Sequence, residues 1–206
     1  MLRLFKIENG LLHKTNVEPE RLRNQLSEVQ WVDMCDPDDD ERLLLESLLH
    51  TDLPESDDVE EIEYSARCFV DQSGIHVHAL FIYQEDGRHS TVSVAFILQD
   101  NRLITIREEK LADFRLFRLR ARRGQIHCTN AAELLVTMFE HKVENHADYL
   151  EDIHHALEDV SHSVLEEEDS DLENSISELA QLEDSNGKIR LCLMDTQRDI
   201  SFLLRH

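Results

Sequence analysis

The stretch IHVHALFIY, residues 75–83, decides the fold, because apolar residues occupy nearly all of its alternate positions on both sides. Neighbouring residues of a strand point to opposite faces, so this pattern predicts a strand covered on both faces. Turn signals at 85–88 and 100–101 connect it to apolar stretches at 91–98 and 103–106. These stretches predict hairpin-linked strands in a sheet that helices cover on two sides.

The first 70 residues supply further strands and helices. Asn9-Gly10 between apolar segments predicts a hairpin over residues 2–14, since both residues readily adopt the positive φ of its turn. The acidic segment from Asp36 predicts a helix start, with Asp36 as the N-cap and Pro37 at the first helical position. The other elements expected here are a helix at 20–28 and strands at 30–34 and 66–70.

A basic helix is expected at residues 111–123, with its arginines packed against acidic helices of the same or a neighbouring chain. Its inward-facing residues are expected to be Phe114, Leu116, Phe117 and Leu119.

Apolar residues recur with a purely helical period from residue 130 onward. Asn130, with an acid three residues later, predicts a capped helix start. Steps of three and four then continue to an acidic break at 166–169 and resume beyond it. Two helices of an antiparallel hairpin are therefore expected. The seam residues expected in the second helix are Leu172, Ile176, Leu179, Leu182 or Glu183, Ile189, Leu193, Thr196, Ile200 and Leu203.

The sequence thus predicts an α+β fold in two parts. Residues 1–129 are expected to form an α/β/α sandwich with a mixed sheet, and residues 130–206 a long antiparallel acidic helical hairpin. The charge changes at the same boundary, from 25 acidic and 16 basic residues before it to 19 acidic and 5 basic residues after it.

The net charge limits the class of partner. The chain has 44 Asp and Glu against 21 Lys and Arg, a formal charge of −23. That balance argues against sequence-independent nucleic-acid binding and against an anionic membrane surface, because both need clustered basic residues. It suits divalent cations or a basic protein partner.

Motifs for catalysis and nucleotide binding are absent from the sequence. It contains no GxGxxG, GxxxxGK[ST], GxSxG or HExxH, so we expect neither an enzyme nor a small-molecule substrate. The four cysteines include no CxxC pair, which favours buried, reduced thiols over a zinc ribbon or disulfides. No signal peptide and no run of 18 apolar residues is present.

Candidate metal ligands occur in several places. His76 and His78 have a spacing that can chelate a transition metal, but two ordinary histidines of a half-buried strand are the simpler and favoured interpretation. Acid–histidine pairs, Glu151/His155 and Glu158/His162, are expected to be solvated pairs on a helix face. Acidic runs occur at 36–41, 57–63, 85–86 and 166–171. Mutual repulsion within such runs is relieved by divalent cations, which gives a physical basis for cation-dependent assembly.

Three segments resemble the CorA family of magnesium and cobalt transporters. They are WVDM at 31–34 with DPDDDER at 36–42, FRLFRLRAR at 114–122, and RLCLMDTQR at 190–198. The resemblance implies the cytosolic N-terminal domain of a homopentameric channel in the inner membrane of a bacterium. It also implies a funnel of acidic helices, with this chain truncated before the stalk and the membrane helices.

Family members bind regulatory Mg²⁺ between subunits, and this ion holds the closed state. By resemblance, Glu85 and Asp86 occupy the place of the acid that follows a hydrophobic sheet strand. Glu166, Glu167, Glu168 and Asp169 are secondary candidates. The implied transported ions are Mg²⁺, Co²⁺ and Ni²⁺.

Two alternatives remain open at this point. One is a zinc transporter of the same superfamily, which the twelve histidines would suit. The other is a soluble acidic adaptor that binds a basic protein through the helical hairpin.

Overall fold

The computed structural model describes residues 1–49, 51, 53–54, 67–85, 87–166 and 172–206. Within these residues the strands form a seven-stranded sheet in the order β2-β1-β3-β7-β6-β5-β4. Among the described strands only β3 and β7 pair in parallel, so the predicted mixed sheet is confirmed. The strands are β1 Leu2–Glu8, β2 Leu11–Thr15, β3 Trp31–Cys35, β4 Cys68–Val70, β5 Ile75–Glu85, β6 Arg88–Gln99 and β7 Arg102–Arg107.

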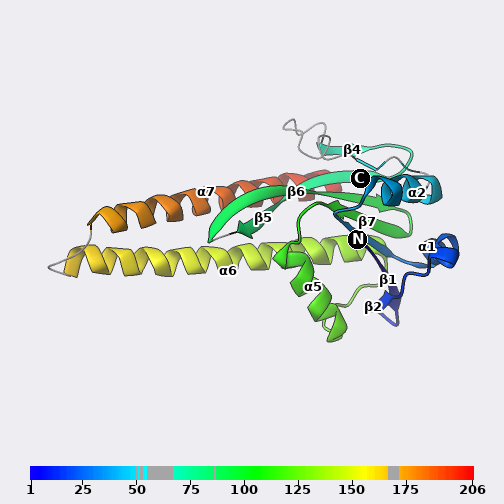
Figure 1. The fold of residues 1–206 in the computed structure, drawn as a ribbon, viewed down its shortest axis with the longest axis horizontal. Coiled ribbons are helices and arrows are strands. Elements are labelled where there is room, and N and C mark those ends of the chain that lie inside the picture. Colours follow the sequence, from blue (N-terminus) through cyan, green and yellow to red (C-terminus); the bar gives the residue numbers. More distant parts are fainter. Residues whose placement is uncertain (50, 52, 55–66, 86, 167–171) are drawn as a thin grey trace.

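Helices cover both faces of this sheet, as the apolar strand faces predict (Figure 1). Neighbouring strand residues enter opposite cores: Trp31 and Phe96 pack in one, and Val32 and Ile97 in the other. The first core contains residues of α5 and α6, and the second contains residues of α1 and α2. The helices are α1 Leu22–Glu28, α2 Asp39–Leu49, α5 Ala112–Arg122, α6 Ala131–Glu166 and α7 Leu172–Leu203.

The turn between β1 and β2 is formed as predicted. Asn9 and Gly10 have φ values of +53° and +78°, and the two strands pair antiparallel on either side of them. Asparagine and glycine tolerate this left-handed backbone better than other residues, which is why the pair sets the turn.

The start of α2 differs from the prediction. Asp36 has a φ of +50°, and its N–H donates to the carbonyl oxygen of Arg107 at 2.8 Å. That bond extends the pairing of β3 with β7, so Asp36 does not cap the helix and Pro37 is not its first residue. The helix begins at Asp39, and the carboxylate of Asp38 accepts the N–H of Glu41 at 2.7 Å.

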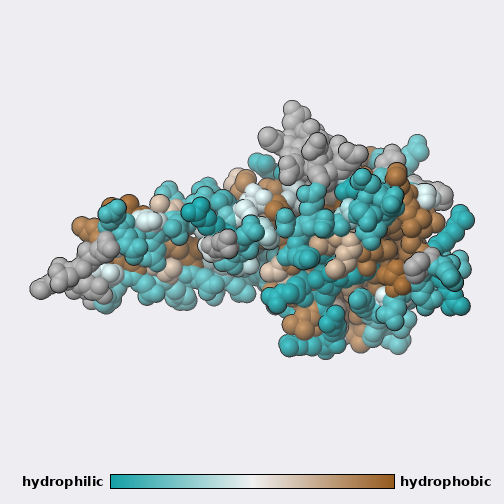
Figure 2. Space-filling view, in the orientation of Figure 1, coloured by the Kyte–Doolittle hydropathy of each residue, from teal (hydrophilic) through white to brown (hydrophobic). Residues whose placement is uncertain are grey.

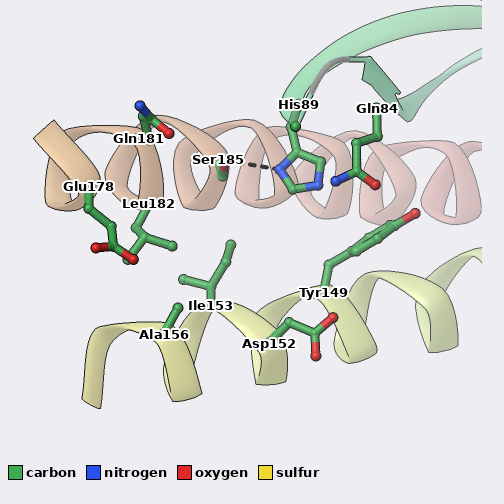
Figure 3. Close-up of a pocket in the computed structure, with 11 residues that line it drawn as sticks. Gln84, His89, Tyr149, Asp152, Ile153, Ala156, Glu178, Gln181, Leu182 and Ser185 are labelled. Carbon is green, nitrogen blue, oxygen red and sulfur yellow. Dashed lines mark hydrogen bonds between the residues drawn. The ribbon is translucent and has the colours of Figure 1, made fainter. Parts of the chain in front are cut away.

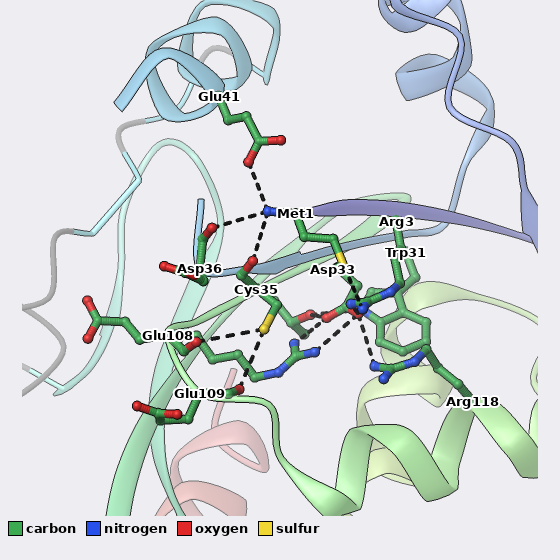
Figure 4. A network of polar contacts seen from close by, with 12 residues as sticks. Met1, Arg3, Trp31, Asp33, Cys35, Asp36, Glu41, Glu108, Glu109 and Arg118 are labelled. Atoms are coloured by element: carbon green, nitrogen blue, oxygen red, sulfur yellow. Dashed lines mark hydrogen bonds and ion pairs between the residues drawn. The ribbon is translucent and has the colours of Figure 1, made fainter. Parts of the chain in front are cut away.

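A buried carboxylate, Asp33 in β3, connects β1, β7 and α5 (Figure 4). Arg107 donates to both of its oxygens, and Arg3 and Arg118 each donate to Oδ2 at 3.2 Å. Thr105 donates its hydroxyl to Oδ1 at 3.1 Å. Burial alone would raise the pKa of Asp33, but the positive charge of Arg107, followed by Arg118 and Arg3, holds that pKa below its ordinary value.

The basic helix α5 faces the interior on one side only. Phe114 and Phe117 are buried, as expected, but Leu119 is 40% exposed and the prediction for it is wrong. Arg118 binds Asp33, whereas Arg120 pairs with Glu144 of α6 at 3.1 Å. Packing of this helix against an acidic helix of its own chain is therefore confirmed at Arg120.

The two long helices α6 and α7 run antiparallel and extend beyond the sandwich (Figure 1). The side chain of Asn130 accepts the N–H of Glu133 at 2.8 Å, which confirms the predicted cap of α6. None of the helices in the described part of the chain is both long and apolar enough to cross a membrane.

The seam expected at the start of α7 is wrong. Leu172, Ile176 and Leu179 are exposed, and Figure 2 shows an apolar patch at this far end of the hairpin. Farther along α7 the expected seam is confirmed at Ile189, which packs with Cys192, with Ile82 of β5 and with Ile153 of α6. Contact with the sheet, which a helical period alone does not reveal, decides which face is buried.

Candidate functional site

The tip of the β5–β6 hairpin is fixed against α7. Gly87 turns the chain with a φ of +77°. The Nζ of Lys188 donates to the carbonyl oxygen of His89 at 2.6 Å and pairs with Asp184 at 2.6 Å. The imidazole Nδ1 of His89 lies 2.9 Å from the hydroxyl of Ser185. Side chains of one face of α7 thus position the tip of this hairpin, next to Glu85 at the end of β5.

A cleft of about 320 Å³ opens beside this tip, between α6 and α7 (Figure 3). Tyr149 and Asp152 of α6 line one wall, and Glu178 of α7 lies on the other helix. The rings of Tyr149 and His89 meet edge-on, with their centres 5.4 Å apart. The remaining lining residues are Gln84, Gly87, Ile153, Ala156, Gln181, Leu182 and Ser185.

A broader groove runs along the same tip and α7. Glu85 and Arg88 of the hairpin line it together with Asp184 and Lys188 of the helix. Glu85 is exposed to solvent there. Its carboxylate is therefore available to a ligand or to another protein chain.

Burial changes the proton affinity of two groups at the cleft. It lowers the pKa of His89, and the nearby charge of Lys188 lowers it further, so the imidazole is neutral at neutral pH. Burial also raises the pKa of Tyr149, with smaller contributions from nearby carboxylates that include Asp152. The cleft thus contains a neutral imidazole, a neutral phenol and two acidic side chains.

The chemistry of this lining suits a hydrated divalent cation. Mg²⁺ retains several of its waters and binds through one or two carboxylates, with amide and hydroxyl oxygens as further partners. Among the described residues no three His, Cys, Asp or Glu side chains come close enough to hold a metal ion together. The described residues could therefore offer carboxylates to the second shell of an ion or part of a ligand set, but they do not form a complete inner shell.

The predicted site residues have different outcomes. Glu85 is at the hairpin tip, as expected, whereas Asp86, Glu167, Glu168 and Asp169 lie outside the described residues. Glu166 is the last residue of α6, and the structure describes its backbone but not its side chain. The first residue of α7, Leu172, precedes Asp184 by about 18 Å of helix, so the hairpin end and the strand tip are separate places.

The two strand histidines do not form a metal site in the described structure. His76 is buried, stacks on Phe69 with ring centres 4.4 Å apart, and lies 3.1 Å from the carboxylate of Asp71. His78 is buried beside the same phenylalanine. They are structural residues of β5, in agreement with the simpler interpretation.

Sequence reasoning missed the cleft residues His89, Tyr149, Asp152 and Glu178. The acids lie on helix faces whose charge pattern is that of any solvated helix, so no signal distinguishes them. The position of His89, directly opposite Gln84 in the hairpin, becomes informative only when the register is known.

Comparison with known proteins identifies the class to which this architecture belongs. The family model described as "CorA-like Mg2+ transporter protein" matches residues 27–206. The chain belongs to this family.

The relatives agree with that assignment. The magnesium transport protein CorA of Escherichia coli strain K12 is 43% identical over 207 residues, covering all of this chain and 65% of that protein. The chain thus spans less than two thirds of that relative's length.

Two solved structures share the fold. The complete CorA magnesium transporter of Methanocaldococcus jannaschii superposes with a TM-score of 0.73 at 17% identity, covering 100% of this chain and 63% of that one. The soluble domain of CorA from the same organism gives 0.69 at 18% identity, covering 95% of this chain and 77% of that one. The predicted fold class and family resemblance are confirmed.

Proposed function

We propose that this chain is the Mg²⁺-sensing cytosolic domain of a CorA-type channel for divalent cations, located at the inner membrane of a bacterium. The transported ion is Mg²⁺, with Co²⁺ and Ni²⁺ as further candidates. The domain assembles with copies of itself, as a pentamer in the whole protein, and a Mg²⁺ ion between copies stabilises the closed state.

The observation that carries this proposal is the incomplete acidic site at the β5–β6 tip. Glu85 is exposed, and the adjoining groove and cleft present Asp184, Asp152 and Glu178, yet the described residues of one chain complete no metal shell. A second copy that brings its own carboxylates would complete it. The transporter family and the surplus of 23 negative charges support the same view.

The sensing mechanism follows from differential affinity. An ion shifts an equilibrium only if it binds one state more tightly than the other. If facing carboxylates approach only in the closed assembly, Mg²⁺ binds that assembly preferentially. When intracellular Mg²⁺ falls, the unbridged acids repel one another and the assembly loosens.

The test replaces both tip acids in the whole protein that contains this domain, as Glu85→Gln with Asp86→Asn. We expect that transport remains and that closure requires a higher Mg²⁺ concentration. Glu28→Gln is the control, because Glu28 pairs with Lys6 of β1, near the edge of the sheet opposite to β5. Unchanged Mg²⁺ dependence in the double variant would refute the site.

Metal competition by calorimetry separates this function from its alternatives. If the chain binds Zn²⁺, and added Mg²⁺ neither binds nor displaces that Zn²⁺, a zinc transporter is favoured. Binding of a basic protein without any metal dependence would favour the acidic adaptor.

A further inference from the structure

A layer of charged side chains is buried where α6 and α7 pack on the edge of the sheet. Its acids are Asp113, Asp195 and Asp199, and its cations are Lys142 and Arg67. Titratable groups beside this layer include Cys68 of β4, His78 of β5, His146 of α6 and Cys192 of α7. None of these groups belongs to the cleft or to the hairpin tip.

The two acids of α7 lie one helical turn apart but have unequal partners. Asp195 accepts the backbone N–H of Leu80 at 2.7 Å and pairs with Arg67 at 3.0 Å. Asp199 is fully buried, and within the described part of the chain its Oδ1 accepts only the weak thiol donor of Cys68, at 3.4 Å. Its Oδ2 has no hydrogen-bond partner among the described residues. Asp195 therefore has strong donors and a positive charge beside its carboxyl group, whereas Asp199 has neither bonded to it in the described structure.

Neither cation of the layer donates a hydrogen bond to Oδ2 of Asp199 in the described structure. Arg67 pairs with Asp195 and donates a hydrogen bond to the carbonyl oxygen of His78, and this hydrogen bond is 2.6 Å long. The Nζ of Lys142 lies over the rings of Phe81 and Phe139, 4.5 and 5.3 Å from their centres. It donates no hydrogen bond within the described structure.

Counting charges in the layer leaves one carboxyl in excess. Three acids face two cations, and burial, followed by the charge of Lys142, lowers the pKa of His146 to about 4, so that imidazole is neutral. Asp113 accepts a hydrogen bond from Asn145 at 2.9 Å on Oδ1, and its Oδ2 has no partner among the described residues. Burial raises the pKa of Asp113 as well, but the Asn145 bond and the charge of Lys142 oppose that rise. Asp199, by contrast, accepts a hydrogen bond only from the thiol of Cys68 within the described residues and faces the charge of Asp195. An isolated buried carboxylate is costly, and such a group takes up a proton instead.

We propose that Asp199 holds a proton when α7 is packed on the sheet, and that loss of this proton loosens the packing of α7 against Cys68 and β5. The buried layer thus couples the packing of the helical hairpin on the sandwich to the binding of one proton. Burial, then the neighbouring charge of Asp195, raises the pKa of Asp199 to about 7, in agreement with this role.

The sign of the pH effect follows from linkage. The folded chain binds the proton of Asp199 more tightly than the unfolded chain, whose aspartates have a pKa near 3.8. The stabilisation is therefore complete below about pH 4 and is lost as pH rises to about 7. His146 acts in the opposite direction, because its stabilisation is lost as pH falls from 6.5 towards 4. In the native chain the two effects partly cancel.

Comparison of the native chain with Asp199→Asn isolates the proton of Asp199. The amide is neutral at every pH and has the shape of the protonated acid. We expect the folding equilibrium constant of the native chain, divided by that of the variant, to fall by about tenfold per pH unit between about pH 4 and 7. Urea unfolding at several pH values measures both constants. Glu183→Gln, at an exposed acid of the same helix that lines neither the cleft nor the groove, is the matched control and should give a flat ratio.

Carboxyl-carbon NMR of the native chain with labelled aspartate gives an independent answer, even if the variant does not fold. We expect one carboxyl to titrate near neutral pH, and its signal to be absent from Asp199→Asn if that variant folds. A flat ratio for Asp199→Asn would overturn the proposal. So would a spectrum in which all aspartate carboxyls are ionised by pH 5.

Discussion

Replacing Asp33 by Asn tests how far one buried carboxylate supports the sandwich. The carboxylate has no exposed surface and accepts bonds from Arg3, Arg107 and Arg118, which come from β1, β7 and α5. Asparagine retains the volume but removes the negative charge, and it turns an N–H donor towards guanidinium groups that are themselves donors. The three positive charges would then lack their common partner.

The magnitude follows from the burial of those arginines. Removal of one partner of a buried ion pair costs about 3–5 kcal/mol. Arg107 is fully buried, but Arg3 and Arg118 retain 17% and 16% side-chain exposure and recover some hydration. We therefore expect a loss near the lower end of that range. A domain of this size loses about 2–4 °C in Tm per kcal/mol, so Tm should fall by roughly 6–12 °C.

Thermal and urea unfolding, monitored by circular dichroism, measure this loss at pH 7. Glu144→Gln is the control, since Glu144 pairs with another arginine of α5 at the solvent-exposed surface. The pKa of Asp33 is held below its ordinary value, so the difference between native chain and variant should shrink as pH falls below about 4. A Tm change under about 2 °C at pH 7 would refute the reasoning.

Two further substitutions test local backbone requirements. Gly74→Ala should destabilise the chain by about 1–3 kcal/mol, because φ there is +142° and a Cβ would lie 2.3 Å from the carbonyl oxygen of Leu98. Gly87→Ala, at +77° with no atom within 4 Å of its Cβ, should cost less, and equal losses by urea unfolding would contradict this explanation. Asn130→Ala should cost about 0.5–2 kcal/mol, since the N–H of Glu133 loses its acceptor, whereas Asn130→Asp should retain most of the stability.

The sheet and its helices could be predicted because their signals are local. Asn9-Gly10 sets a turn by its backbone preference, and alternating residues in β6 fill both cores. The start of α2 could not be placed correctly, because Asp36 is drawn into the β3–β7 pairing by a bond to Arg107, 71 residues away.

The candidate site was predictable only at Glu85, which follows a recognisable strand. The cleft depends on which faces of α6 and α7 meet the hairpin tip, and their residues resemble ordinary solvated acids in sequence. The same holds for the buried layer: Lys142, Asp195 and Asp199 belong to acidic helices, and only contact with the sheet removes them from water.

Native mass spectrometry of the chain with and without Mg²⁺ tests the sensing claim most directly. If Mg²⁺ bridges acids of neighbouring copies, oligomers should increase with Mg²⁺, carry bound ions, and require more Mg²⁺ in the variant with Glu85→Gln and Asp86→Asn. An unchanged mass distribution over a wide range of Mg²⁺, with no ion retained, would contradict the claim.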